Sequence, residues 1–174
     1  MPDSTLYILC GLPFSGKTTL ASALADNCGF VHLDLDALAR AKSLSPEAGI
    51  NDEQWGRIFT EVYQQVAALL ASGKSVLVDA VNYDRAGRDR FRTIAQESGS
   101  PVYVIYINIK IQEIEQRRQA NQATPQRPPV RDKDFVELAA EFEIPTNEEN
   151  LLMYDGTLGI SEWIEEYIHC EFHT

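Results

Sequence analysis

The sequence contains few cysteines, and their spacing does not match a metal site. Among its 174 residues there are three, Cys10, Cys28 and Cys170, and no two of them are spaced like the ligand pairs of zinc sites. This argues against a structural zinc site. Cys10 falls within an apolar run, so we expect buried free thiols, as in proteins of a reducing cytoplasm.

Long hydrophobic runs and an excess of positive charge are also lacking. No run approaches the length of a membrane span and the N-terminus has no signal-peptide pattern, so we expect no membrane contact and a cytoplasmic location. Lysine and arginine number 15 against 26 aspartate and glutamate, a formal charge of -11. This charge argues against an extended nucleic-acid surface but allows a local basic pocket. The length predicts one domain, residues 1–174, with a substantial core.

The sequence does contain a phosphate-binding loop between a predicted strand and a predicted helix. Residues 11–18 fit the pattern G-x-x-x-x-G-K-[ST], in the strand-before and helix-after context that the pattern requires. Such a loop directs backbone N–H groups and the positive end of the helix at phosphate oxygens. The residues expected to bind a nucleoside triphosphate are Gly11, Leu12, Pro13, Phe14, Ser15, Gly16, Lys17, Thr18 and Thr19.

Two side chains of this loop are suited to phosphoryl transfer. Lys17 can reach the β- and γ-phosphates, which makes it an expected catalytic residue, and the Thr18 hydroxyl can bind Mg²⁺. The sequence therefore predicts a nucleotide and Mg²⁺ as ligands. The remaining needs are cations for the phosphate oxygens and a group that orients the nucleophile.

Strand-like and helix-like segments alternate along the chain. This alternation predicts a five-stranded parallel sheet with right-handed crossovers, in a three-layer α/β/α P-loop fold. Ligands of such sheets bind at the carboxyl ends of the strands. We expect a surface excursion from residue 37 to 49, followed by a helix whose apolar stripe, Trp55 included, belongs to the core. The predicted strands are residues 6–10, 30–33, 75–78, 101–109 and 151–154.

Two aspartates follow the second predicted strand. Asp34 and Asp36 are two residues apart, so in an extended chain their side chains share a face. One of them would accept the proton of an attacking hydroxyl, and we favour Asp36; Asp34 would then assist with the metal or with orientation. The alternative is that one of these aspartates only caps the helix that follows.

Other candidates lie near the same edge of the predicted sheet. Asp79 ends the third strand, where it would hold Mg²⁺ or bind Thr18, or else only cap the strand end. Arg40 would bind a phosphate or carboxylate of the acceptor, or remain an exposed arginine. Asn82 and Arg88 are further candidates for substrate binding, with a surface salt bridge as the alternative for Arg88.

A polar segment rich in arginine separates the last two predicted strands. Residues 117–134 contain three prolines and four arginines, and this composition predicts a mobile lid. An arginine that closes over the γ-phosphate would stabilise the transition state and exclude water. We assign Arg117 and Arg118 to catalysis and Arg127 to ATP binding; Arg131 is the fourth arginine of the lid.

These residues together resemble the small P-loop kinases grouped with polynucleotide 5′-hydroxyl kinases, zeta toxins and chloramphenicol phosphotransferases. The resemblance implies a nucleoside-monophosphate-kinase-like fold and ATP-dependent phosphorylation of a hydroxyl, with Asp36 or Asp34 as the base and lid arginines on the phosphates. It also implies an adenine pocket near residues 155–157. The similar residues are those at 8–21, 33–36, 78–82, 88, 113, 117 and 142–145.

The sequence departs from the pattern of that group in the lid. Its members often carry two lid arginines four residues apart, whereas here the residues four positions after Arg117 and Arg118 are Asn121 and Gln122. Arg127 or Arg131 would have to compensate.

Three functions fit the sequence. The first is transfer of the γ-phosphate of ATP to a hydroxyl of a small molecule or of a nucleotide or polynucleotide 5′ end. The second is a nucleoside monophosphate kinase, with Arg40 and Arg88 binding the acceptor's phosphate. The third is an ATPase or nucleotide switch without an acceptor. The pair Asp34 and Asp36 favours the first, because it suits a hydroxyl acceptor.

Overall fold

The computed structural model describes residues 4–168 and confirms the predicted sheet. Five strands form one sheet in the order β2-β3-β1-β4-β5, and every neighbouring pair is parallel. The predicted positions agree with the observed ones to within two residues at each end. The strands are β1 (Leu6–Cys10), β2 (Val31–Asp34), β3 (Val76–Asp79), β4 (Val102–Ile107) and β5 (Leu151–Tyr154).

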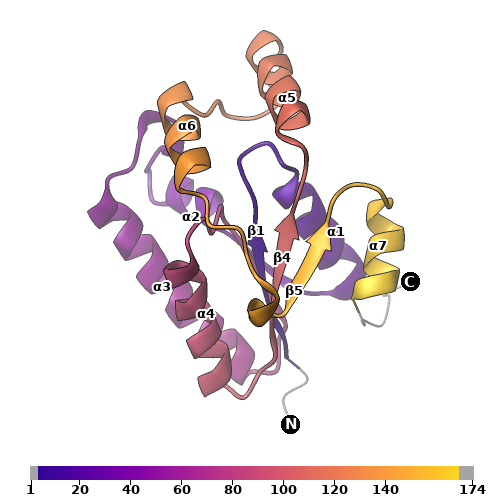
Figure 1. The fold of residues 1–174 in the computed structure, drawn as a ribbon. Coiled ribbons are helices and arrows are strands. Elements are labelled where there is room, and N and C mark those ends of the chain that lie inside the picture. Colours follow the sequence, from indigo (N-terminus) through magenta and orange to yellow (C-terminus); the bar gives the residue numbers. More distant parts are fainter. Residues whose placement is uncertain (1–3, 169–174) are drawn as a thin grey trace.

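Helices connect consecutive strands, as Figure 1 shows. The α-helices are α1 (Lys17–Cys28), α2 (Leu35–Ala41), α3 (Asp52–Ala71), α4 (Arg85–Glu97), α5 (Ile111–Ala123), α6 (Asp132–Glu141) and α7 (Ile160–Tyr167). Two short 3₁₀ turns are η1 (Pro46–Ala48) and η2 (Asn147–Glu149).

The sheet is covered on both faces, which gives the expected three layers. Alternate residues of β1 point to opposite faces: Leu6 and Ile8 pack with residues of α3 and α4, whereas Tyr7 and Leu9 pack with residues of α1 and α7. Every residue of β1 is buried, as in a central strand of a parallel sheet. The sheet edge that carries the P-loop is therefore built on a rigid core.

The sequence explains where the long helix α3 begins and ends. Asn51 caps it together with Gln54, whose side chain reaches back to the Asn51 amide. Gly73 follows the helix with a φ of +77°, which is favourable for glycine. The buried stripe at helical spacing matches the prediction and consists of Ile58, Val62, Val66 and Leu70.

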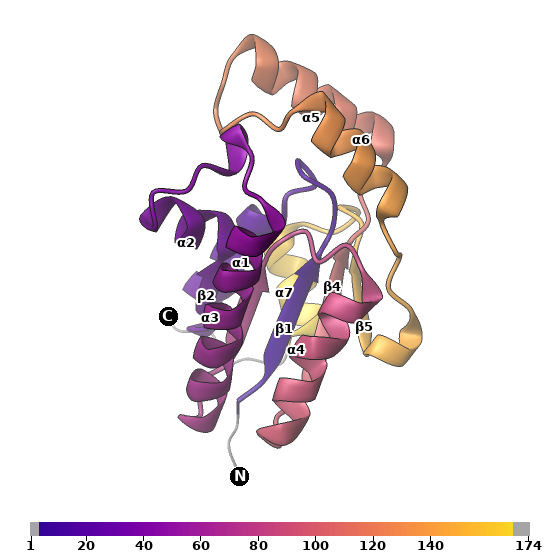
Figure 2. The ribbon, with the colours of Figure 1, turned by 90° about the vertical axis from the view of Figure 1, so that its left-hand side faces the viewer.

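The segment predicted as a lid lies beyond the carboxyl ends of the strands (Figures 1 and 2). It contains the second half of α5, a connecting loop and the start of α6, so it is more helical than its composition suggested. The loop reaches across to the surface excursion between α2 and α3, because a Cβ at Gly49 would lie 2.9 Å from Arg131 Nη2. Arg131 also pairs with Asp134 in α6, at 2.7 Å.

The cysteines agree with the prediction only in part. Cys10 is a buried free thiol, and burial raises its pKa to about 12. The expectation of a free thiol is wrong for Cys28, which is disulfide-bonded, since spacing along the chain does not report proximity in space. Cys170 lies outside the described residues. Within residues 4–168, none of the helices has the length and apolarity that crossing a membrane requires.

Candidate active site

The phosphate-binding loop runs from the end of β1 to the first residue of α1. Gly11 lies where two backbone segments approach closely, because a Cβ there would come within 3.2 Å of the Ile107 carbonyl oxygen. Gly16 has a φ of +104°, and α1 begins directly after it. A larger residue would strain the backbone at Gly16, so these two glycines permit the shape of the loop.

Lys17 is held inside this loop. Its Nζ donates a hydrogen bond of 2.9 Å to the Leu12 carbonyl oxygen, and its side chain is buried. Burial lowers the pKa of Lys17 to about 8, although Asp79 acts in the opposite direction. A phosphate beside Nζ would favour the charged ammonium form.

A buried hydroxyl in the loop lacks the partner that a phosphate would supply. Ser15 Oγ is buried and has no hydrogen-bond partner among residues 4–168, and such orphaned groups are rare in native structures. Thr18, the second residue of α1, is exposed and lines a cavity. A phosphate at the N-terminus of α1 fits both observations, and Thr18 is then placed to hold Mg²⁺.

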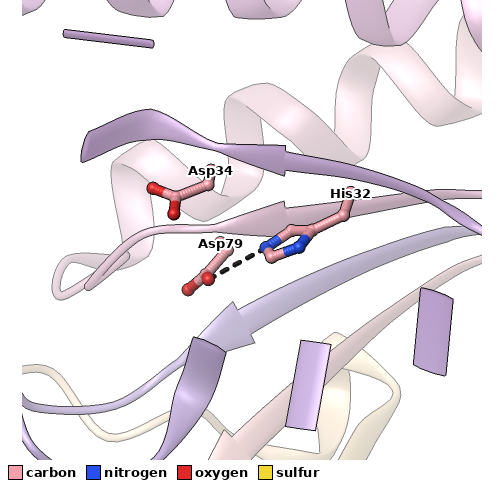
Figure 3. A group of neighbouring side chains, drawn as sticks. All are labelled: His32, Asp34 and Asp79. Atoms are coloured by element: carbon pink, nitrogen blue, oxygen red, sulfur yellow. Dashed lines mark hydrogen bonds and ion pairs between the residues drawn. The ribbon is translucent and has the colours of Figure 1, made fainter. Parts of the chain in front are cut away.

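Three side chains at the ends of β2 and β3 form a compact cluster (Figure 3). Asp34 and Asp79 are register partners on these strands, and the possible ligand atoms of His32, Asp34 and Asp79 all lie within 4.8 Å of one another. His32 Nε2 lies 3.0 Å from Asp79 Oδ2, and this hydrogen bond raises the pKa of His32. Sequence reasoning missed His32, because only the strand order places β2 beside β3.

The predicted arrangement of Asp34 and Asp36 on one strand face is wrong. The strand ends at Asp34, whose Oδ1 accepts a hydrogen bond of 2.9 Å from the Ala37 amide and so caps α2. The capping alternative is thus confirmed for Asp34. Asp36 lies in the first turn of α2 and lines the same cavity as Lys17.

The surroundings of Asp36 favour its protonated form. The walls of the cavity reduce the hydration of its carboxylate, and this desolvation together with the charge of Asp34 raises the pKa of Asp36 against the effect of Arg40 and Lys17. A raised pKa brings a carboxylate nearer to the range in which a general base works well at neutral pH.

A cavity of about 990 Å³ lies on one side of the P-loop, beside α5 and the loop after β5. Arg117 lines it and donates hydrogen bonds from Nη1 to the carbonyl oxygens of Phe14 and Ser15, at 3.1 and 3.0 Å. Asp155 and Gly156, expected on the adenine side, line the same cavity. The cavity offers space for a nucleoside next to the phosphate-binding loop.

A second cavity of about 1080 Å³ lies on the other side of the loop, among residues of α2, α3, α4 and the lid. The two cavities share Phe14, Gly16, Thr19 and Arg127. The Arg127 guanidinium lies 4.5 Å from the centre of the Phe14 ring, so this lid arginine stands at the boundary between them. A terminal phosphate held by the P-loop would therefore border both cavities.

Two other predicted arginines are engaged in ion pairs. Arg118 pairs with Asp132 and lies 4.9 Å from the centre of the Phe135 ring, so it joins α5 to α6. Arg118 is not among the described residues that line the two cavities. Arg40 lines the second cavity, as expected, but its Nη2 lies 2.6 Å from Glu47 Oε1.

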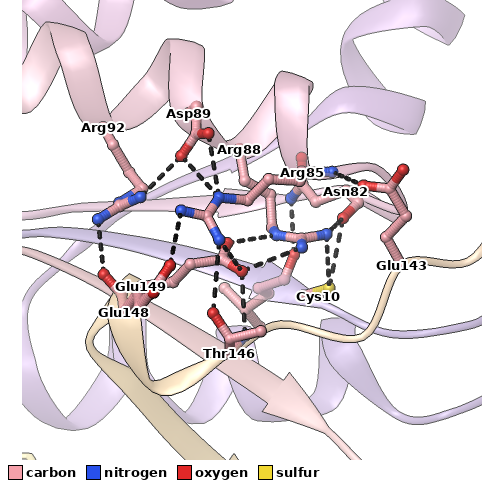
Figure 4. Close-up of polar contacts among 11 residues, drawn as sticks. Cys10, Asn82, Arg85, Arg88, Asp89, Arg92, Glu143, Thr146, Glu148 and Glu149 are labelled. Atoms are coloured by element: carbon pink, nitrogen blue, oxygen red, sulfur yellow. Dashed lines mark hydrogen bonds and ion pairs between the residues drawn. The ribbon is translucent and has the colours of Figure 1, made fainter.

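The structure contradicts the substrate-binding role predicted for Arg88. Its side chain is 1% exposed, pairs with Glu149 at 2.7 Å and donates to the Asn82 carbonyl oxygen at 2.9 Å (Figure 4). The arginine therefore lies in the interior, away from any acceptor. Asn82 borders the second cavity, but its amide group donates to the Leu9 carbonyl oxygen at 2.6 Å and so holds β1.

Comparison with known proteins identifies a family and a curated relative. The AAA domain model matches residues 6–145. A probable adenylyl-sulfate kinase of Aeropyrum pernix is 31% identical over 112 residues, which are 63% of this chain and 61% of that protein. The match thus spans less than two thirds of the relative's length.

Solved structures of similar shape cover nearly the whole chain. Kti12 of Chaetomium thermophilum, in complex with ADP-AlF3, has a TM-score of 0.76 at 16% identity, with 95% of this chain and 98% of that chain covered. The APS kinase of Mycobacterium tuberculosis, in complex with AMPPNP and APS, has a TM-score of 0.69 at 20% identity, with 97% of each chain covered. At these identities the comparison shows a shared fold.

Proposed function

Since the chain belongs to the AAA domain family, we propose that it is an ATP-dependent kinase that transfers the γ-phosphate to a hydroxyl group. The acceptor is a small molecule or a nucleotide end. The observation that carries the proposal is the position of the P-loop at the boundary of two cavities. The residues that line both cavities are Phe14, Gly16, Thr19 and the lid residue Arg127. An enzyme that transfers phosphate between two bound molecules needs such an arrangement.

Several residues of the loop would act in this reaction. The backbone of residues 11–18 and the Ser15 hydroxyl would bind the phosphates of ATP, with Lys17 on the β- and γ-phosphates. Thr18 and Asp79 are the residues that would hold Mg²⁺, which neutralises phosphate charge when bound. His32, which is hydrogen-bonded to Asp79 at 3.0 Å, would keep that carboxylate in place, whereas Asp34 caps α2.

Asp36 would act as the general base. The oxygen of the acceptor hydroxyl forms a bond to the γ-phosphorus, the bond from that phosphorus to the bridging oxygen of ADP breaks, and the hydroxyl proton passes to the Asp36 carboxylate. Arg127 would bind the phosphate in transfer, and Arg117 would line the nucleoside side. The lid, residues 117–134, would close to exclude water; Arg118 supports it through α6.

The proposal is tested by transfer of labelled γ-phosphate from ATP to a panel of hydroxyl acceptors. We expect label on an acceptor, and we expect Asp36→Asn to lower kcat by about 10²-fold or more while ATP binding persists. Asp34→Asn serves as the matched control, because asparagine caps a helix about as well as aspartate, so this variant should keep both the α2 cap and most of the kcat. Label found only as free phosphate, at equal rates in parent and Asp36→Asn, would establish an ATPase instead.

A further inference from the structure

Resting on the proposed phosphotransfer, we infer the chemical class of the acceptor: a neutral compound whose hydroxyl groups are carried on a ring. The ring packs against one face of α3, over Gly56, and presents a hydroxyl to Asp36. Sugars and nucleosides share this chemistry. Acceptors that carry a phosphate, sulfate or carboxylate are disfavoured by the excess of carboxylates in the cavity.

The wall of the second cavity on α3 is aromatic. Trp55, Phe59 and Tyr63 follow one another at intervals of four residues and all three line the cavity. The ring centres of Trp55 and Phe59 are 6.3 Å apart, and those of Phe59 and Tyr63 are 6.0 Å apart. Each is half-buried, so the core covers one side of the ladder and the cavity meets the other. Trp55, predicted as a core residue, therefore packs on the core with one side and lines the cavity with the other, and the sequence did not predict this second contact.

A glycine interrupts this helix on the same wall. Gly56 lines the cavity, and a Cβ added there would meet no atom within 4 Å. Its φ is not in the left-handed region, so neither packing nor backbone shape requires glycine here. Glycine inside a helix costs about 1 kcal/mol relative to alanine. Open space for a ligand beside Trp55 is the advantage that the structure shows.

The charges around this wall favour hydroxyl groups over anions. Five aspartates line the cavity: besides Asp34 and Asp79 of the β2–β3 cluster, these are Asp36, Asp52 and Asp84. They are acceptors for the O–H groups of a neutral ligand and would repel an anionic one. The acidic surroundings also contribute, after burial, to the raised pKa of Tyr83, which lines the same cavity.

The arginines on this side of the P-loop already make contacts within the protein. Arg40 is paired with Glu47, Arg88 is buried against Glu149, and the Arg90 guanidinium lies 5.4 Å from the centre of the Tyr63 ring. Lys17 and Arg127 stand at the loop, where ATP would engage them. An acceptor with its own negative charge would thus face an excess of carboxylates, and to pair with Arg90 it would have to replace that arginine's contact with Tyr63.

The test uses matched acceptors that differ only in charge. Neutral sugars are compared with their sugar phosphates and sugar acids, and nucleosides with nucleoside monophosphates, at equal ATP·Mg²⁺. We expect a kcat/KM at least about 100-fold higher for the neutral member of the preferred pair, since unpaired buried charge is strongly disfavoured. The sugar and nucleoside arms identify which ring is used. Efficient transfer to an anionic member, with none to its neutral counterpart, would overturn the inference.

Gly56→Leu tests where the ring lies. Leucine is a better helix former than glycine and its side chain would enter the cavity, so we expect an unchanged or higher melting temperature, unchanged ATP binding and a KM for the acceptor raised about tenfold or more. Arg57→Leu is the control, since Arg57 adjoins Gly56 on the same helix, is 76% exposed and lies outside the cavity. Equal acceptor KM values in both variants would show that the acceptor ring does not lie over Gly56.

The two proposals fail in different ways. Transfer to anionic acceptors alone leaves the kinase proposal intact and removes the inference about the acceptor. Absence of transfer to every acceptor, with ATP hydrolysis that no acceptor accelerates, removes the kinase proposal itself.

Discussion

Lys17 connects the burial of one side chain to the affinity of the whole loop for a nucleotide. The lysine is buried at 9% exposure, and in the free protein its ammonium group has one loop carbonyl, that of Leu12, as its hydrogen-bond partner. Burial disfavours the charged form, which is the form that attracts phosphate. Nucleotide binding and protonation of Lys17 are therefore linked.

ATP binding is expected to weaken at alkaline pH. With the pKa of Lys17 lowered to about 8, the amine is charged below that pH and neutral above it before ATP arrives. Affinity should stay level below about pH 7 and fall, by up to about tenfold per pH unit, above about pH 8, because binding must then take up a proton. Calorimetry in buffers of different ionisation enthalpy measures this uptake directly.

Lys17→Arg is the control for that titration. The guanidinium remains charged throughout this titration. The variant should therefore bind ATP more weakly, but its affinity should not change between about pH 7 and 9.5, a range that brackets the pKa of Lys17. A parent protein whose ATP affinity does not change across this range would contradict the assignment.

The buried pair of Arg88 and Glu149 is expected to support stability and not acceptor binding. Burial would raise the pKa of Glu149, but hydrogen bonds from Arg88 and from the Thr146 amide lower it below its ordinary value. Removing one partner leaves a buried charge uncompensated, so Glu149→Gln should lower the free energy of unfolding by about 3 to 5 kcal/mol. Urea unfolding measures this loss.

An exposed ion pair provides the comparison. Glu53 and Arg57 are both 76% exposed, and Glu53→Gln should change the free energy of unfolding by less than about 1 kcal/mol.

At a temperature where Glu149→Gln remains folded, its KM for the acceptor should equal that of the parent. A raised acceptor KM without loss of stability would restore the binding role that the sequence predicted for Arg88.

At the scale of elements, α2 shows what could and could not be read from the chain. The strands, α3 and the P-loop were predictable because their apolar spacing and glycine pattern are local. The seven-residue helix α2 was not, since Asp34 has the same appearance in a strand end and in a helix cap. Arg88 was misassigned for a similar reason: its partner Glu149 is 61 residues away.

At the position where the resembled group often carries its second lid arginine, α5 has Asn121. Asn121 is buried in α5 and its Oδ1 accepts hydrogen bonds from the amides of Gln126 and Arg127, while its Nδ2 donates to the Arg127 carbonyl oxygen, all at 3.0 Å. These bonds fix the loop backbone that brings the Arg127 guanidinium over Phe14. An asparagine thus positions an arginine six residues further on.

Asn121→Ala should therefore weaken ATP use without unfolding the protein. Three hydrogen bonds of about 1 kcal/mol each are lost from an exposed loop, so we expect the KM for ATP to rise about tenfold or more. The adjacent Gln122 is exposed, and Gln122→Ala should leave the KM unchanged. Equal KM values in the two variants, with equal melting temperatures, would show that Arg127 is not held by Asn121 for this purpose.

At the scale of the molecule, the core determines the position of the site. The two apolar faces of the sheet pack against different helices, which leaves the carboxyl edge of the strands for polar residues. The sequence predicted that Asp79 and the P-loop meet there. It did not predict the two cavities or their shared residues, because their walls come from segments as far apart as α3 and the lid.

Because the site is formed by many elements, nucleotide binding should stabilise the entire fold. A ligand present at 100 times its dissociation constant adds about 2.7 kcal/mol to the free energy of unfolding, and for a chain of this length that corresponds to a melting temperature raised by about 5 to 10 °C. We expect this shift with a non-hydrolysable ATP analogue and Mg²⁺, and a smaller one with a chelator present. Asp79→Asn should give the smaller shift even with Mg²⁺, since it removes a carboxylate that would hold the ion. A full shift in Asp79→Asn would place the metal elsewhere than at the end of β3, and the absence of a shift in the parent protein would remove the nucleotide site itself.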